Sequence, residues 1–344
     1  MTEYLVQART CSVCGTTTIG QAPQGVGGRV QYGPGVWAHA ANLTCANHIP
    51  VGRAAGLLSD LLGVRASVGF VAGVRGVAAG RLGPFMERVR WLLGQAGVLG
   101  VDETPGRAAG GLVYVHVACT EFLTHLHVGG RCADDIDAGG VLVGYSGTIV
   151  RGGDAGYAHL ADALHAWCGA HGLRDLRAVW EADPAGQTWA QAMADLLVYA
   201  NKAAGAARAA GAEALDGATL ARVVAWYRGA VAKGMADNQR RRTPAAKDGL
   251  RLARRFGRHE AMILRFATDL SVGFTNNQSE RDVRPVKVQQ RASGGCWRTL
   301  QGLADFAVVQ SYLSTAAKWG VDKLAALRQL FATGPWLPPA LGPG

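Results

Sequence analysis

The sequence predicts an α/β protein with a partly antiparallel sheet, interrupted by a long helical region. Residues 112–118 and 122–128 alternate between apolar and polar side chains, as the two strands of a β-hairpin do. Short apolar strands are predicted over 97–102 and 147–154, on either side of this hairpin. Between residues 176 and 264 the pattern is helical and strand signals are few. Strands followed by helices in this order indicate an α/β fold.

Size and composition indicate a large globular protein. The 344 residues are 49% hydrophobic and 17% charged, which is enough for two or three domains and excludes global disorder. No apolar run approaches the roughly 18 residues that cross a bilayer, and the first residues lack a signal-peptide pattern. Seven cysteines, an odd number, fit a disulfide scaffold poorly. We therefore expect a reduced cytoplasmic protein with no membrane partner.

The first segment, residues 1–25, contains a C-x-x-C pair formed by Cys11 and Cys14. Two thiolates at this spacing, followed by a glycine, are typical of a zinc knuckle in a partial zinc-ribbon-like segment. A structural zinc site needs four ligands, and no second C-x-x-C follows. Cys45 and His48 have a suitable spacing, but they fall in a predicted helix where burial is expected. The pair supplies half of a zinc site, so a zinc-binding and a metal-free segment both stay open.

Residues 26–95 form a predicted helical region that resembles a helix-turn-helix unit. Leucines cluster on one face of a helix over 52–62, and Gly63 then supplies a turn. Ser67 is placed to cap a second helix over 68–77. This spacing suits a DNA-reading unit, although two helices that only pack together show the same pattern. We predict DNA binding for this region.

Three carboxylates occupy positions that suit metal chemistry. Asp102 and Asp154 each follow a predicted strand, and Glu280 lies near the start of a late helix with Asn276 or Asn277 as its N-cap. A single carboxylate at such a place is typical of a turn or cap. Carboxylates that converge from different elements can instead hold two divalent cations, and Mg²⁺ prefers such oxygen ligands.

Positive charge is concentrated late in the chain. The net charge is +10, and residues 238–300 contain 14 Lys and Arg against 5 Asp and Glu. Such a segment favours a polyanion, usually nucleic acid, over the alternative of a solvated helix face. Within it, a basic stripe follows one side of a helix that begins after Thr243 and Pro244, and we predict that it contacts DNA: Arg251, Arg254, Arg255 and Arg258.

Several motifs, in order along the chain, resemble those of the insertion sequence 66 family of DDE transposases. The most specific is N-N-x-x-E-R-x-x-R, which begins at Asn276. The others are an Asp-Glu-Thr-Pro motif at the first acid, a tyrosine three residues after the second acid, a C-x-A-H-x-L-R segment and a late Arg-Thr-Leu-x-Gly segment. They stand at 102–105, 154–157, 168–174 and 298–302.

The resemblance implies a ribonuclease H-like catalytic core with a helical insertion. The core would comprise residues 96–175 and 265–325, with a basic helical insertion over 176–264 and a mobile tail over 326–344. Asp102, Asp154 and Glu280 would be the catalytic, metal-binding triad for two Mg²⁺ or Mn²⁺ ions. These ions would support in-line attack on phosphodiester bonds.

Further residues receive roles beside this triad. Arg281, Arg284 and Lys287 follow Glu280 at helical spacing and are predicted to hold DNA phosphates, the alternative being neutralisation of Asp282 and other nearby carboxylates. Cys168 and His171 are expected to be structural residues near the site, rather than ligands of a metal. His125 and His127 share a strand face and are expected to pack there or lie at the surface.

The function implied is a DNA transposase of an insertion element. It would cleave the element's ends and join them to target DNA, as a homo-oligomer assembled on double-stranded DNA and associated with the nucleoid. Family members usually carry an upstream segment with an earlier C-x-x-C, so we expect a chain truncated at its N-terminus. Two alternatives stay open: a catalytically incompetent remnant that only binds DNA, and a nuclease that only cuts.

Overall fold

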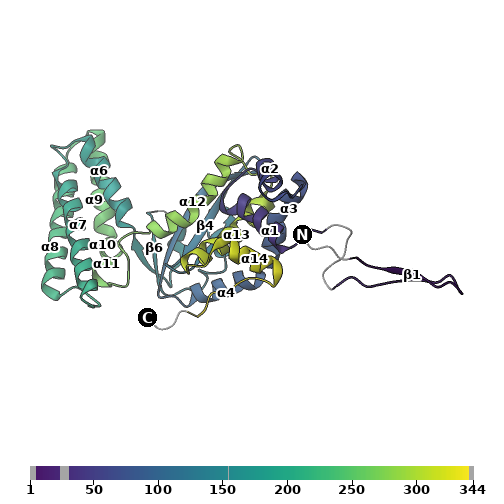
Figure 1. Ribbon diagram of the computed structural model, residues 1–344. Helices are drawn as coiled ribbons and strands as arrows, with labels where there is room; N and C mark the ends of the chain where they lie inside the picture. The colour runs from purple at the N-terminus through teal and green to yellow at the C-terminus, as the bar shows by residue number, and fades with distance from the viewer. Residues whose placement is uncertain (1–4, 24–30, 154, 341–344) are drawn as a thin grey trace.

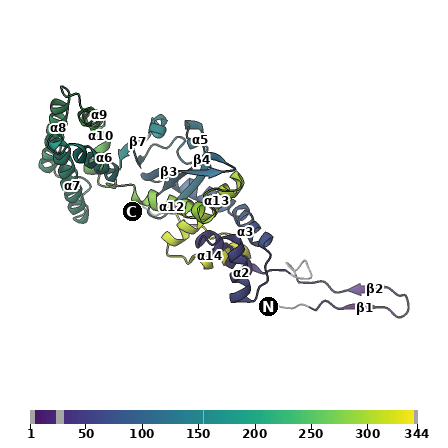
Figure 2. The ribbon, with the colours of Figure 1, turned by 90° about the horizontal axis from the view of Figure 1, so that it is seen from above.

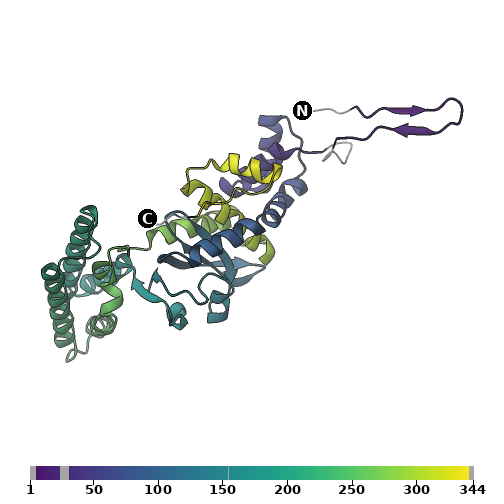
Figure 3. The same cartoon turned by 90° about the horizontal axis from the view of Figure 1, so that it is seen from below.

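A five-stranded mixed sheet lies at the centre of the protein (Figure 1). The computed structural model describes residues 5–23, 31–153 and 155–340. A helical bundle stands at one end of the sheet, and the N-terminal and C-terminal helices pack at the other (Figure 1). A thin hairpin of β1 (Ala8–Thr10) and β2 (Thr17–Ile19) extends away from the rest in every view (Figures 2 and 3).

The predicted α/β class with a partly antiparallel sheet is confirmed. Its strands lie in the order β5-β4-β3-β6-β7, with β3, β4 and β5 antiparallel and β6 and β7 parallel to β3. The short β7 was not predicted, because four residues are too few to show alternation. The bounds are β3 (Val98–Ala108), β4 (Gly111–Cys119), β5 (Thr124–Gly129), β6 (Thr148–Arg151) and β7 (Leu164–Trp167).

Strand β3 is longer than predicted, which changes the place of Asp102. β4 pairs with β3 as far as Ala108, whereas β6 pairs with it only from Val98 to Gly100. Asp102 therefore lies inside β3, opposite Val117, and the prediction that it ends the strand is wrong. It nevertheless lies two residues beyond Gly100, the last residue of β3 that pairs with the parallel strand β6.

The N-terminal helices contain the predicted pair. Gly63, with φ +64°, ends α2, and the Ser67 hydroxyl accepts a hydrogen bond from the Phe70 backbone at 3.1 Å to cap α3. Glycine is common at such a C-cap because it adopts the left-handed conformation without strain. Serine is common at an N-cap because its hydroxyl accepts a hydrogen bond from a backbone N–H that has no partner within the helix. The elements are α1 (Pro34–Ala41), η1 (Asn42–Ala46), α2 (Val51–Leu62), α3 (Val68–Arg81) and α4 (Gly83–Gly94).

These helices share one hydrophobic core with α13 (Leu300–Lys318) and α14 (Lys323–Ala332). Phe85 of α4 meets Tyr312 of α13 edge to face, with ring centroids 5.0 Å apart. The expected mobile tail over 326–344 is wrong in its first part, because α14 continues to Ala332 and buries Leu327 and Leu330 completely. Residues 341–344 lie outside the described residues.

The helical region is confirmed and begins earlier than predicted, at Gly169. Its core contains the large buried side chains of Trp189, Tyr227 and Phe256. Arg241 in the α8–α9 connection pairs with Asp183 at 2.5 Å and ties this connection to the α6–α7 loop. The helices are α6 (Gly169–Ala182), α7 (Thr188–Ala209), α8 (Gly217–Asn238), α9 (Pro244–Arg258), α10 (Glu260–Ile263) and α11 (Arg265–Thr268).

The remaining helix, α12 (Asn277–Ala292), returns the chain to the sheet and packs on β3 and β4. A short helix, α5 (Ala133–Asp137), and a 3₁₀ turn, η2 (Ala155–His159), lie in the connections around β6. Within the described ranges, the helices lack the combination of length and apolar character that a membrane crossing requires.

Candidate active site and nucleic-acid interface

Helix α12 approaches β3 closely, and this contact brings Glu280 to the strand that carries Asp102. The Asn276 side-chain amide, at the N-cap of α12, donates to the Val101 carbonyl at 3.4 Å. A Cβ atom added at Gly100 would lie only 2.4 Å from the hydroxyl of the fully buried Ser279. The glycine therefore allows the helix to pack this tightly. Glu280 follows Ser279 directly and so enters the same corner of the sheet.

The pKa of Asp102 reflects the groups around it. Burial, aided by the charges of Glu103 and Glu280, raises the pKa of the Asp102 carboxyl to about 6. The backbone N–H of Glu103, which donates to Asp102 Oδ1 at 2.9 Å, and the ring of His171 act in the opposite direction. Two carboxylates and an imidazole thus share one corner. Asp154, the third predicted acid, lies outside the described residues.

The raised pKa of Asp102 predicts a pH-dependent cost to stability in the metal-free protein. Its ordinary value is 3.8 and its folded value about 6, so the folded state binds the proton more tightly and loses stability as pH rises through this window. Asp102→Asn removes the charge. In EDTA, the advantage of Asp102→Asn in free energy of unfolding should grow by on the order of 1 kcal/mol from pH 5 to pH 8, as measured by urea titration. A constant difference would contradict the assigned burial.

Cys168 and His171 lie beside these carboxylates. The Cys168 sulfur accepts a hydrogen bond from the Asn276 backbone at 3.4 Å, so it holds the start of α12 against the start of α6. His171 Nε2 lies 3.8 Å from Glu280 Oε1. A hydrogen bond with Cys168 raises the pKa of His171, despite its partial burial, and the Glu280 charge adds to this effect. These contacts place both residues beside Glu280 and the start of α12, and their structural role stays a prediction.

The candidate metal ligands divide between two places. The described residues contain no group of three or more His, Cys, Asp or Glu side chains arranged to hold a metal ion. At the corner of β3 and α12, the described residues contribute the carboxylates of Asp102 and Glu280. In the hairpin, Cys11 and Cys14 are exposed in the turn between β1 and β2, and hydrogen bonds with Thr16 lower the pKa of Cys14 to about 7. A thiol of this kind ionises readily, which suits metal binding.

The three basic residues after Glu280 do not behave alike. Arg281 and Arg284 lie on the exposed side of α12, where Arg291 continues the same face. Lys287 donates to the Pro105 carbonyl and so fastens α12 to β3. Lys287 was predicted to hold DNA, but in this structure its ammonium group binds the protein backbone instead. The exposed basic face of α12 is therefore defined by Arg281, Arg284 and Arg291.

Asp282 is buried and has its own partner, Lys318 of α13. Their side chains are 5% and 9% exposed and are joined at 2.6 Å. The alternative in which Arg281 and Arg284 neutralise Asp282 is therefore wrong. Lys318 also donates to the carbonyls of Thr120 and Leu123, both at 2.8 Å, while the Thr124 hydroxyl donates to Asp282 at 3.0 Å. This network ties α12 to α13 and to the β4–β5 turn.

The stripe on α9 contains three exposed arginines and one that is partly buried. Arg251, Arg254 and Arg258 are exposed, and Arg251 pairs with Asp248 of its own helix at 2.9 Å. Arg255 instead forms an ion pair with Asp175 of α6, and its guanidinium lies over the Trp167 ring at 5.5 Å. Arg255 was predicted to contact DNA from an exposed face, but it turns toward the sheet.

The exposed face of α3 does not suit a helix that reads bases. Its buried side packs against α13, and Arg75 lies over Trp297 at 5.3 Å. The exposed positions from Val68 to Gly80 carry only small or apolar side chains: Val68, Gly69, Ala72, Gly73, Gly76, Val77 and Gly80. Reading of base edges needs hydrogen-bond donors or acceptors, and the Arg81 side chain at the end of α3 donates to the Leu330 and Phe331 carbonyls instead. DNA binding by residues 26–95 stays a prediction.

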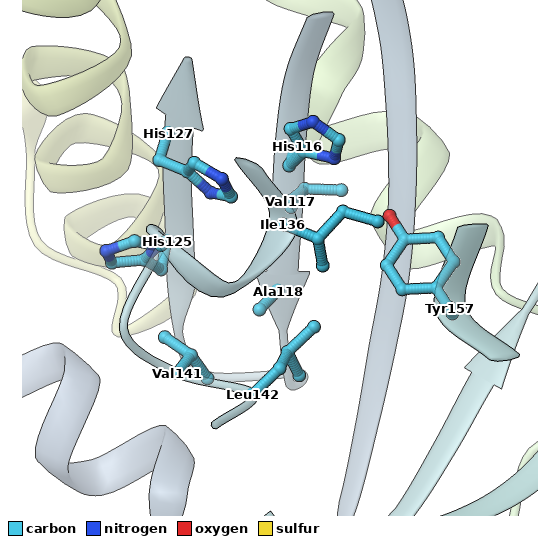
Figure 4. Close-up of a pocket in the computed structure, with 10 residues that line it drawn as sticks. His116, Val117, Ala118, His125, His127, Ile136, Val141, Leu142 and Tyr157 are labelled. Carbon is cyan, nitrogen blue, oxygen red and sulfur yellow. The ribbon is translucent and has the colours of Figure 1, made fainter. Parts of the chain in front are cut away.

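Three histidines lie on the opposite face of the sheet from α12 (Figure 4). His116 and His127 are register partners on β4 and β5, and their rings stack with centroids 4.8 Å apart. His116 Nε2 donates a hydrogen bond to the Gly130 carbonyl at 2.7 Å, and His127 Nε2 donates one to the Asp135 carbonyl at 2.9 Å. Burial lowers the pKa of His125 to about 3 and that of His127 to about 4, so both are neutral. The packing role expected for His125 and His127 agrees with this arrangement.

Comparison with known families adds an independent finding. A family model described as "Transposase IS66 family" matches residues 29–304 of the chain. This range begins before α1, includes Asp102 and Glu280, and ends in the first turn of α13. A search of curated proteins found no match.

Proposed function

The chain belongs to the IS66 family of transposases, and we propose that it cleaves the ends of its insertion element and joins them to target DNA. Asp102, Asp154 and Glu280 are the proposed catalytic residues. The observation that carries the proposal is the shared corner of the sheet, where α12 brings Glu280 to the buried carboxyl of Asp102. Family membership alone assigns only transposition in general.

The topology supports a ribonuclease H-like core. Three antiparallel strands are followed by two parallel strands, and the first strand lies in the middle of the sheet. The helical bundle enters after β7 and the chain then returns through α12. In this arrangement the first and third acids come from the central strand and from the helix packed on it, and Asp154 follows the last residue of β6 by three positions in the sequence.

The donor set at the corner fits divalent cations. Carboxylate oxygens are the ligands that Mg²⁺ and Mn²⁺ take in proteins. Burial disfavours the charged form of the Asp102 carboxyl, and a bound cation would favour it. Two bound cations would supply activation of a water or hydroxyl nucleophile and stabilisation of the leaving oxygen. The chain itself holds Asp102 in a rigid strand and Glu280 in a helix fastened by Asn276 and Lys287. His171 lies where it can hold a proton beside Glu280.

Two exposed basic faces support binding of double-stranded DNA. The first is the α12 face of Arg281, Arg284 and Arg291, and the second is the α9 stripe of Arg251, Arg254 and Arg258. They come from the core and from the helical bundle respectively, so a duplex held by both would lie along the catalytic corner. Transposition joins two element ends to one target, so we propose a homo-oligomer assembled on DNA.

The α9 stripe makes a prediction that salt dependence can test. Replacement of Arg251, Arg254 and Arg258 by Ala should weaken binding to all DNA sequences alike, because backbone contacts do not read bases. Each lost contact also releases fewer counterions, so the slope of log K against log salt should fall by roughly 2–3. Fluorescence anisotropy of a labelled duplex over a range of KCl concentrations measures this slope.

A control comes from α6, outside the stripe. Arg177 of α6 is exposed and pairs with Glu181 of its own helix at 2.7 Å, so Arg177→Ala removes one charge without touching the stripe. An unchanged slope in the triple variant would show that the stripe is a solvated face. Folding should be unaffected, since exposed charges contribute only about 0–1 kcal/mol each.

The proposed activity itself is tested with the DNA that flanks the coding gene. Inverted repeats found there supply the substrate, as a labelled duplex that contains one end. The full chain with Mg²⁺ should cut this duplex at the element boundary and join the released strand to a second duplex. Binding without cutting would favour the remnant that only binds DNA, and cutting without joining would favour the nuclease.

A further inference from the structure

A cleft separates the catalytic corner from the helical bundle. Its walls come from the end of β7, the first turns of α6 and the C-terminal half of α9, and they include residues of both the core and the bundle: Gly153, Trp167, Cys168, His171, Asp175 and Arg255. Because His171 also lies 3.8 Å from Glu280, the cleft opens beside the proposed catalytic residues.

Two buried N–H donors belong to the residues that line this cleft. The indole Nε1 of Trp167 and the guanidinium Nε of Arg255 are both shielded from solvent, and no residue in the described ranges accepts a hydrogen bond from either. Both atoms can only donate, so no rotation or change of tautomer would satisfy them. Buried donors are nearly always paired in native proteins, and an unpaired one costs free energy. Two of them in one cleft indicate an acceptor that comes from outside the chain.

The surroundings hold these donors in place, and arginine charges lie near the His259 ring that packs on Trp167. The guanidinium of Arg255 is fixed by its ion pair with Asp175 and by the Trp167 ring, which also packs at a tilt against His259 with centroids 4.6 Å apart. The pKa of His259 is lowered by burial and by the charges of Arg258, Arg151 and Arg255. An acceptor that enters between these groups would therefore be favoured if it carried negative charge.

We propose that this cleft binds one phosphate group of the DNA backbone next to the cleaved bond, with Trp167 Nε1–H and Arg255 Nε–H as donors to its oxygens. This inference rests on the proposed function, because the DNA strand that reaches the catalytic corner supplies the phosphate. It assigns Trp167 a role that the sequence motifs do not give it, and it explains why Arg255 departs from the exposed stripe. The ion pair with Asp175 leaves Nε of Arg255 available for a ligand.

Inorganic phosphate is the first probe, titrated into the full chain by calorimetry against KCl of equal ionic strength. Trp167→Phe removes the N–H donor and keeps an aromatic ring, while Arg255→Lys keeps the charge that pairs with Asp175 and loses Nε. Each should weaken phosphate binding about tenfold, as expected for loss of a hydrogen bond to a charged group. Arg177→Ala removes a whole charge from an exposed position of α6 outside the stripe and should change the affinity less than about twofold. Circular dichroism and thermal melting check that each variant is folded.

Two results would overturn the proposal. The first is wild-type chain that gives no saturable phosphate binding, and the second is equal binding by the wild type, Trp167→Phe and Arg255→Lys. A second probe is an element-end duplex in which a single phosphate near the cleaved bond is replaced by a neutral methylphosphonate. This change should weaken binding by the wild type and have a smaller effect on Trp167→Phe, which retains only the Arg255 donor. Because neither probe requires cleavage, a chain that binds phosphate here but does not cut DNA would refute the proposed function and leave the cleft assigned.

Discussion

Asp102→Asn and Glu280→Gln should each reduce Mg²⁺-dependent cleavage of an element-end duplex at least about 100-fold, because divalent cations supply several kcal/mol of transition-state stabilisation. Each substitution is nearly isosteric and removes one negative charge from the corner where β3 and α12 meet. DNA affinity should stay equal or rise slightly, since repulsion of the phosphates decreases. Single-turnover cleavage on a denaturing gel, together with anisotropy on the same duplex, separates these two effects.

Glu103→Gln is the matched control for this pair. Glu103 follows Asp102 on β3, and its carboxylate pairs with Arg131 at 2.8 Å. Successive side chains of a strand point to opposite faces, so the substitution removes the same charge from the other side of the sheet. Cleavage by Glu103→Gln should stay close to that of the wild type. Equal cleavage by Asp102→Asn, Glu280→Gln and wild-type chain would refute the assignment of both catalytic residues.

Lys318→Met should lower the free energy of unfolding by about 3 kcal/mol, because it leaves the buried Asp282 carboxylate without its counter-charge. Both side chains are at least nine-tenths buried, and Lys318 also binds two carbonyls of the β4–β5 turn. Asp282 is two residues from Glu280 on α12, so a shift of this helix should also lower the cleavage rate. Urea unfolding followed by circular dichroism measures the loss.

Lys233→Met tests whether burial causes this effect. Lys233 pairs with Asp237 on α8 at the same kind of distance, 2.8 Å, but it is half exposed. Its substitution should cost less than about 0.5 kcal/mol, as exposed helical pairs do. The double variant Asp282→Asn with Lys318→Met should recover part of the stability, because the buried charge is then gone. Equal losses for Lys318→Met and Lys233→Met would contradict the structural role of the Asp282–Lys318 pair.

The sequence predicted the elements whose signals are local. The Gly63 turn, the Ser67 cap, the hairpin of β4 and β5 and the helical region all depend on neighbouring residues, and the structure contains them. The length of β3 was missed because it depends on pairing with β4 and not on apolar periodicity. The helix in the expected tail was missed because packing against α1 stabilises it.

The candidate site was predictable only through its motifs. Asp102 and Glu280 are 178 residues apart, and their meeting depends on Gly100 and Ser279, which allow the close packing of β3 and α12. No local pattern distinguishes the buried Asp282 from an exposed helix residue, since its partner Lys318 comes from another helix. Arg255 could not be distinguished from the exposed arginines of α9 for the same reason. Its partners, Asp175 and Trp167, come from other elements of the fold.

The central claim is that Asp102 and Glu280 hold the same cations together with Asp154. Its most direct test is the anomalous scattering of crystals soaked in Mn²⁺, which locates the ions without reference to activity. We expect Mn²⁺ peaks at the corner between β3 and α12, roughly 2 Å from carboxylate oxygens of Asp102 and Glu280, and two ions roughly 4 Å apart when DNA is bound. These peaks should be lost in Asp102→Asn. Mn²⁺ bound elsewhere, with none at this corner in crystals that contain cleavable DNA, would contradict the account.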